Sequence, residues 1–221
     1  MPAPFIKICC ISSVDEAQLA LAHGVSGIGL VSEMPSGPGV IAYSLITRIV
    51  ESLPASARTF LLTSRQTAEG IAQQHRSCRT TTIQLVDDVP VLELRALRSL
   101  LPGIQLVQVI HVTGESSVRQ ARAIGPHVDA LLLDSGNPAL RVKELGGTGR
   151  THDWGLSHRI CRGSAIPVLL AGGLNPGNAA DALRQVAPFG LDVCSGVRTD
   201  GHLDPDKLQR FVAAARSWPT S

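Results

Sequence analysis

Short apolar runs alternate with amphipathic stretches along the whole chain. The runs are rich in Ile, Leu and Val without polar alternation, which is typical of parallel strands covered on both faces. Eight such runs occupy residues 5–9, 27–31, 59–63, 81–85, 105–111, 129–133, 167–171 and 191–194. Eight segments with helical periodicity occupy residues 14–23, 42–53, 67–75, 90–101, 115–124, 153–161, 176–186 and 205–217.

Several of the helical segments also carry start signals. Ser13 precedes the first segment, and Asn175-Pro176 and Asp204-Pro205 place proline at the first helical position of the last two. Counting gives eight strand–helix units, with no leftover element and no linker rich in Pro, Gly or Ser. The pattern therefore belongs to the α/β class.

Two architectures fit this alternation. A doubly wound open sheet more usually has six strands, with a glycine-rich loop after the first. Here the first run ends in Cys9-Cys10, and the glycine-rich turns follow the last three runs. The sequence therefore predicts a (β/α)8 TIM barrel, in which residues 1–221 form a single domain.

Composition narrows the function classes. The 221 residues are 44% hydrophobic, and 20 basic against 18 acidic residues give a net charge of only +2, which excludes disorder and a broad basic face for nucleic acid. No run approaches the roughly 20 apolar residues of a membrane span, and the first seven residues lack a secretory pattern, so we expect a cytoplasmic protein. Five cysteines without a C-x-x-C spacing predict neither a disulfide framework nor a metal site.

The glycine-rich turns after the last two runs are candidate anion sites. In this fold, phosphate is commonly held by the loops after the seventh and eighth strands. Gly172 and Gly173 lie in the first of these loops, and Ser195 and Gly196 lie in the second. Glycine lets backbone N–H groups approach an anion closely, although the same residues also make ordinary tight turns. We predict a phosphate site there, toward which Arg198 could swing.

Candidate chemistry also follows the first and sixth runs. Lys7 and Cys9 are two residues apart and share one face of a strand, whereas Cys10 would face away from the cavity. Asp134 follows the sixth run, nearly opposite in a barrel. A thiolate base and a carboxylic acid so placed could isomerise a small substrate, with Lys7 among the binding residues. The alternatives are a small buried apolar cysteine and an aspartate that caps a helix.

Together these motifs resemble the phosphoribosylanthranilate isomerase family. The matching segments run in chain order from the first strand to the eighth and cover essentially the whole chain: Lys7-Ile-Cys9, Leu132-Leu-Asp134, Gly146-Gly-Thr-Gly149 with Asp153-Trp154, Leu170-Ala-Gly-Gly-Leu174 and Asp192-Val-Cys-Ser-Gly196. The resemblance implies a (β/α)8 barrel that catalyses an Amadori rearrangement in tryptophan biosynthesis. It implies a phosphorylated sugar amine as the small-molecule partner, without metal or organic cofactor. From composition, we expect neither nucleic acid nor a membrane as a partner.

The resemblance also implies roles for the matching residues. Cys9 would act as general base at C2 of the ribosyl group, and Asp134 as general acid on the furanose ring oxygen. Asp192 would contact the sugar, and the turns at Gly172–Gly173 and Ser195–Gly196 would hold the phosphate.

Four positions depart from the family pattern. Cys10 replaces a glycine, Gly39 replaces the arginine of Ser-Pro-Arg, Val86 replaces the histidine of Gln-Leu-His-Gly, and Arg198 replaces a glutamate. The arginine at position 39 would engage the anthranilate carboxylate. The phosphate half and the proton-transfer residues are therefore kept, while the half that binds the aromatic acid is changed.

These departures leave three functions open. The leading one is an isomerase of this type, either with a related substrate or with Arg65 or Arg198 in place of the missing arginine. In the former case Gly39→Arg with Val86→His should restore activity on phosphoribosylanthranilate. The second is a non-catalytic barrel that binds a phosphorylated ligand. The third is thiol chemistry, such as redox sensing or soft-metal capture, at Cys9–Cys10, which is disfavoured because adjacent strand residues point to opposite faces.

Overall fold

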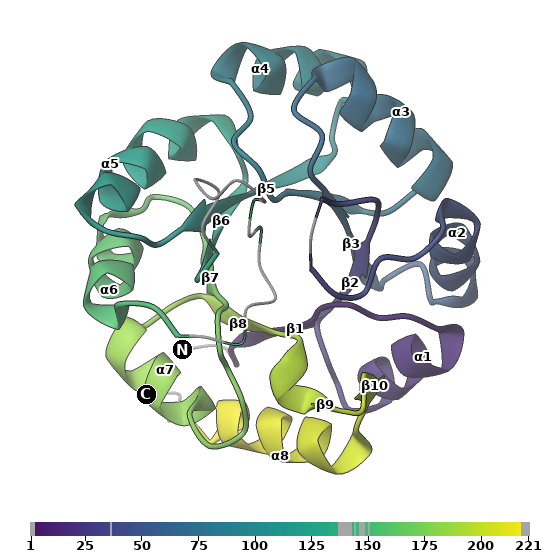
Figure 1. Ribbon diagram of the computed structural model, residues 1–221, viewed down its shortest axis with the longest axis vertical. Coiled ribbons are helices and arrows are strands. Elements are labelled where there is room, and N and C mark those ends of the chain that lie inside the picture. Colours follow the sequence, from purple (N-terminus) through teal and green to yellow (C-terminus); the bar gives the residue numbers. More distant parts are fainter. Residues whose placement is uncertain are drawn as a thin grey trace.

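Eight parallel strands close into a barrel surrounded by helices, as Figure 1 shows. The computed structural model describes residues 3–35, 37–136, 143, 145, 149 and 151–217. The barrel strands are β1 (Phe5–Ile8), β2 (Gly27–Val31), β3 (Arg58–Thr63), β4 (Thr82–Leu85), β5 (Gln105–His111), β6 (Ala130–Asp134), β7 (Val168–Leu170) and β8 (Gly190–Val193). The outer helices are α1 (Val14–Ala22), α2 (Tyr43–Ser52), α3 (Ala68–Cys78), α4 (Val91–Leu100), α5 (Glu115–Ile124), α6 (Trp154–Gly163), α7 (Ala179–Val186) and α8 (Pro205–Arg216). The predicted TIM barrel is confirmed.

Side chains along β1 alternate between two apolar layers. Ile6 and Ile8 belong to the core between the strands and the helices. Lys7 and Cys9 alternate with them, and Cys9 belongs to the smaller apolar cluster together with residues such as Leu132 of β6. This alternation of two residues along a strand places Lys7 and Cys9 on one face, as the sequence predicts.

Two of the predicted helix starts are confirmed by their caps. The Ser13 side chain accepts a hydrogen bond from the backbone N–H of Glu16, 3.1 Å away, at the start of α1. Asp204 accepts from the N–H of Lys207 at 3.0 Å, and Pro205 is the first residue of α8. Each cap satisfies a backbone donor that the helix itself leaves unpaired.

The third predicted start is wrong, because α7 begins at Ala179 rather than at Pro176. The Asn178 side chain accepts from the N–H of Asn175 at 2.8 Å and donates to the carbonyl of Gly173 at 3.0 Å. These bonds hold residues 175–178 in a turn, which is the usual competition of asparagine with helical hydrogen bonding.

Two short features at the edge of the barrel are absent from the sequence prediction. β1 ends at Ile8, so that Cys10 adopts a left-handed backbone with φ 60° instead of continuing the strand. Between β8 and α8, the chain forms an antiparallel pair of two-residue strands, β9 (Arg198–Thr199) and β10 (His202–Leu203). No helix within the described ranges is long and apolar enough to cross a membrane.

Candidate active site

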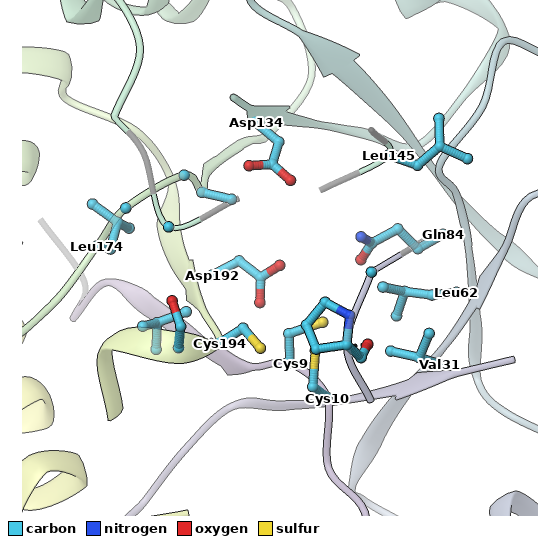
Figure 2. A pocket seen from close by; sticks show the side chains of 18 of the residues that line it. Cys9, Cys10, Val31, Leu62, Gln84, Asp134, Leu145, Leu174, Asp192 and Cys194 are labelled. Atoms are coloured by element: carbon cyan, nitrogen blue, oxygen red, sulfur yellow. Dashed lines mark hydrogen bonds between the residues drawn. The ribbon is translucent and has the colours of Figure 1, made fainter. Parts of the chain in front are cut away.

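A cavity opens at the carboxyl ends of the barrel strands. Its empty space, about 670 Å³, includes part of the open solvent above the strand ends. Figure 2 shows the side chains that surround it. The lining residues come from both halves of the barrel: Cys9, Cys10, Val31, Met34, Gly37, Pro38, Leu62, Gln84, Asp134, Leu145, Gly149, Ala171, Gly172, Gly173, Leu174, Asp192, Val193, Cys194 and Ser195.

Cys9 and Asp134 face the cavity from opposite sides (Figure 2). The backbone N–H of Cys9 donates to the carbonyl of Val193 at 2.8 Å, which extends the pairing of β1 with β8 by one residue and fixes Cys9. Asp134 ends β6, and its Oδ1 accepts from the backbone N–H of Ser135 at 2.7 Å. A thiol and a carboxyl group therefore border the same space from the ends of two separate strands.

Asp192 lies between them and is held by Lys7. The Lys7 Nζ donates to both carboxylate oxygens of Asp192 at 2.9 Å, and both side chains are buried. Burial opposes protonation of the ammonium group, but the charge of Asp192, followed by that of Cys9, outweighs it and raises the pKa of Lys7 to about 12. Asp192 lines the cavity and Lys7 does not, but Lys7 donates hydrogen bonds to the Asp192 carboxylate. Lys7 is thus placed to orient Asp192 instead of contacting a substrate directly.

The two glycine-bearing turns meet on the side of the cavity formed by β7 and β8. Gly172 and Gly173 have φ values of 82° and 64°, a left-handed backbone that favours glycine, and both line the cavity with Ser195. Gly196 serves a different purpose, because a Cβ atom there would lie 1.9 Å from the carbonyl oxygen of Leu174. Its lack of a side chain allows the two turns to pack against each other.

The structure corrects the expected direction of Cys10. Because its backbone is left-handed, its side chain lines the cavity and does not point away from it. The guanidinium group of Arg198 donates to the carbonyl oxygens of Cys9, at 3.2 Å, and Cys10. These bonds stabilise the turn, and the left-handed region accounts for glycine in the family pattern.

Arg198 is therefore not placed to bind an anion, contrary to expectation. Its Nη1 donates to Glu16 of α1 at 2.9 Å, and the two side chains are 9% and 11% exposed. The other candidate replacement for the missing arginine, Arg65, is exposed and lies outside the lining of the cavity. Neither arginine lines the cavity.

A cation that sequence spacing did not reveal reaches the end of β4 instead. Lys143 donates to Oδ2 of Asp87 at 2.6 Å, although 56 residues separate them. Beside them, His111 of β5 contacts the carbonyl of Val86, 2.9 Å from its Nε2. Polar groups therefore remain near the position where the family histidine is missing. Asp87 follows β4 itself, but His111 comes from β5 and Lys143 from the segment between β6 and α6, so no local motif indicates the group.

His152 is a second residue that sequence reasoning missed. Its Nε2 is 2.7 Å from the hydroxyl of Ser157, while its buried Nδ1 has no hydrogen-bond partner among the described residues. A Cβ atom on Gly172 would lie 3.1 Å from that Nδ1, so the ring lies against the β7 turn. Of the neighbouring 146–149 motif, Gly149 lines the cavity and the other residues lie outside those described. No group of three or more His, Cys, Asp or Glu in the described part of the chain could hold a metal ion.

Comparison with known proteins gives this cavity a family context. The family described as PRAI, N-(5'phosphoribosyl)anthranilate (PRA) isomerase, matches residues 7–214. N-(5'-phosphoribosyl)anthranilate isomerase 2 of Methanosarcina mazei is 33% identical over 214 residues, which cover 96% of this chain and 94% of the relative. The crystal structure of phosphoribosyl anthranilate isomerase from Thermotoga maritima is 26% identical with a TM-score of 0.83, covering 97% of this chain and 99% of that one. A phosphoribosyl anthranilate isomerase in complex with reduced 1-(o-carboxyphenylamino)-1-deoxyribulose 5-phosphate shares the fold at 24% identity and a TM-score of 0.81, covering 97% and 99% of the two chains. This chain belongs to the N-(5'-phosphoribosyl)anthranilate isomerase family.

Proposed function

We propose that this protein catalyses the Amadori rearrangement of N-(5'-phosphoribosyl)anthranilate, an aldose–ketose isomerisation in tryptophan biosynthesis. The observation that carries the proposal is the arrangement of Cys9 and Asp134 on opposite sides of one cavity, with two glycine-bearing turns on a third side (Figure 2). The reaction needs a group that donates a proton to the furanose ring oxygen and a second group that removes a proton from C2. The structure of a relative in complex with a reduced ribulose phosphate of this class supports the same type of ligand here.

The phosphate of the substrate would bind at the turns after β7 and β8. Gly172, Gly173 and Ser195 line that side, and the left-handed glycines allow the backbone to approach an anion closely. Asn178 fixes the loop by donating to the carbonyl of Gly173. The site therefore uses preformed backbone instead of flexible cationic side chains.

With the phosphate held there, the ribosyl ring extends toward Asp134 and Cys9. Asp134 donates a proton to the furanose ring oxygen, the ring opens, and the lone pair of the anthranilate nitrogen forms a protonated imine at C1. The Cys9 thiolate then removes the proton from C2, and the electron pair moves toward nitrogen to give an enol amine. Tautomerisation of this enol amine gives the aminodeoxyketose, so the substrate and product have the same composition.

Asp192 would orient the sugar between the two proton-transfer groups. Its carboxylate borders the cavity and is held by two hydrogen bonds from Lys7. A carboxylate fixed in this way accepts a hydrogen bond from a sugar hydroxyl without reorganising, which is the usual gain from a preorganised site. Lys7 acts as a positioning residue in this arrangement.

Two measurements on the purified protein test the proposal. Turnover of N-(5'-phosphoribosyl)anthranilate should be detectable by loss of its fluorescence, and reduced 1-(o-carboxyphenylamino)-1-deoxyribulose 5-phosphate should bind by calorimetry. Ser195→Asp should weaken the binding because it places a carboxylate against the phosphate, whereas Cys78→Ser in α3 is a matched control. Binding without turnover would identify a non-catalytic barrel that keeps the phosphate site. Absence of both would refute the proposal.

A further inference from the structure

Three thiols meet at the rim of the cavity between β1 and β8. Cys9, Cys10 and Cys194 all line it, and Figure 2 shows their sulfur atoms directed toward the same space. The register explains the meeting, because Ile8 pairs with Val193 and the next residue of each chain segment is a cysteine. The left-handed backbone of Cys10 then brings the third thiol to the same side. The argument against thiol chemistry, that adjacent cysteines point to opposite faces, does not hold in this turn.

The pKa values of Cys10 and Cys194 are shifted in opposite directions. A hydrogen bond between their thiols is the main cause that lowers the pKa of Cys194; burial opposes this, and the charge of Arg198 adds to it. The same hydrogen bond raises the pKa of Cys10, and a hydrogen bond to Cys9 and burial act in the same direction. Ionisation is therefore favoured at Cys194 over Cys10, and the thiolate is the form that reacts with oxidants.

The two cysteines outside the site provide a contrast. Burial raises the pKa of Cys78 in α3 to about 11 and that of Cys161 in α6 to about 12. Thiols with such pKa values are inert, since the thiolate is the nucleophile. Cys194 is partly exposed and borders an open cavity, so that a small oxidant can reach it.

We propose that Cys10 and Cys194 form an oxidisable dithiol, which a hydroperoxide converts to a disulfide across the rim of the cavity. The Cys194 thiolate attacks the distal peroxide oxygen, the O–O bond breaks, and Cys194 becomes a sulfenic acid while an alkoxide or hydroxide leaves and takes a proton from water. The Cys10 sulfur then attacks the Cys194 sulfur and the S–O bond breaks. The Cys10 proton joins the departing hydroxide, which leaves as water. Two thiols are oxidised and one peroxide is reduced.

A disulfide there would join the turn that carries Cys9 to the turn that carries Ser195. The first holds the proposed base and the second borders the proposed phosphate site. We therefore expect oxidised protein to lose turnover and a thiol reductant to restore it. That loss rests on the proposed function, whereas the disulfide itself does not, and the two are measured separately.

The test treats the full-length protein with a small excess of hydrogen peroxide and digests it with trypsin without reduction. Cleavage after Lys and Arg places Cys9 and Cys10 in one peptide, residues 8–48, and Cys194 in another, residues 185–198. We expect a cross-linked species of these two peptides, with the mass of two hydrogen atoms lost and two of the five thiols no longer titratable. Turnover is followed in parallel, before and after dithiothreitol.

Three variants identify the cysteines that form the disulfide. Cys10→Ser should abolish the cross-link and leave a sulfenic acid on Cys194 that a dimedone probe labels. Cys9→Ser should retain the cross-link, although it is expected to be inactive, and Cys78→Ser should behave as wild type. A cross-link that persists in Cys10→Ser and disappears in Cys9→Ser would overturn the assignment to Cys10. Oxidation of all five thiols at similar rates, with no linked peptides, would overturn the proposal itself.

Discussion

The side chain of Cys10 occupies the space that a side chain on Gly39 would need. A Cβ atom on Gly39 would lie 2.5 Å from the Cβ and 3.1 Å from the Sγ of Cys10, and Gly39 has φ 82°. The family pattern has glycine at the first position and arginine at the second. If the resemblance aligns these positions as it implies, the two departures are coupled by packing, because the side chains of glycine and arginine at them would be exchanged for those of cysteine and glycine.

This relationship changes what the restoring substitution should do. Gly39→Arg alone should destabilise the protein by about 1–3 kcal/mol through overpacking against Cys10. The left-handed backbone adds roughly 1–2 kcal/mol for any non-glycine residue. Adding Cys10→Gly should recover the overpacking part, and denaturant midpoints of the single and double variants would measure it.

Gly103 provides a matched control for the Gly39→Arg and Cys10→Gly variants. It has φ 85°, and no atom lies within 4 Å of a Cβ atom placed there. Gly103→Arg should therefore show only the backbone cost, and Cys10→Gly should not relieve it. Equal losses of stability at both glycines would contradict this coupling.

The Val86→His part of the restoring pair meets a separate obstacle. Val86 is 1% exposed, so there is little room for the larger histidine ring.

The barrel could be predicted from the sequence because its signal is spread over many residues. Eight apolar runs and the helices between them repeat one period, and small errors at each end do not alter the count. The conformation of Cys10 could not be predicted in this way. It depends on carbonyl contacts from Arg198, a residue 188 positions away in the chain. The same holds for Asp87 and Lys143, which pair although 56 residues separate them in the chain.

The proposed acid and base should be individually essential for turnover. Cys9→Ser and Asp134→Asn should each lower kcat by at least about 100-fold, the lower range for positioned acid–base catalysis, with a smaller change in KM. Cys10→Gly should have a far smaller effect, because glycine suits the left-handed backbone at that position. Stopped-flow measurements of the chemical step would check this, and equal losses at Cys9 and Cys10 would show that both thiols act in proton transfer.

Lys7 and Asp192 should behave as a coupled buried pair. Lys7→Met leaves the Asp192 carboxylate buried without its cation, which typically costs roughly 3–5 kcal/mol. Adding Asp192→Asn should recover much of that stability but not the turnover, because the variant lacks the carboxylate that orients the sugar. Thermal melts and steady-state kinetics on the wild type, Lys7→Met and the double variant would separate the two roles. Full turnover in the double variant would contradict the role assigned to Asp192.

Glu16 should make stability depend on acidity. Burial opposes its ionisation, but hydrogen bonds from Arg198 and from the backbone N–H groups of Leu203 and Ser12 lower its pKa in the folded protein. A lowered carboxyl pKa stabilises the fold above the ordinary value of about 4.3 and loses that contribution as the pH falls through the folded value. Glu16→Gln should therefore be most destabilising at neutral pH and progressively less so toward pH 3. A constant difference in urea midpoint across that range would contradict this.

His152 should make stability depend on pH in a higher range than Glu16 does. Burial lowers its pKa in the folded protein, against the opposing charges of Asp134 and Asp153. Below the ordinary value of about 6.5, the unfolded chain binds a proton that the folded chain does not, so His152 reduces stability as the pH falls. His152→Gln, which stays neutral, should lessen the fall in stability between pH 7.5 and pH 5.5, as measured by urea unfolding. A pH profile of His152→Gln that is identical to that of the wild type would show that the His152 ring is not kept neutral by burial against the β7 turn.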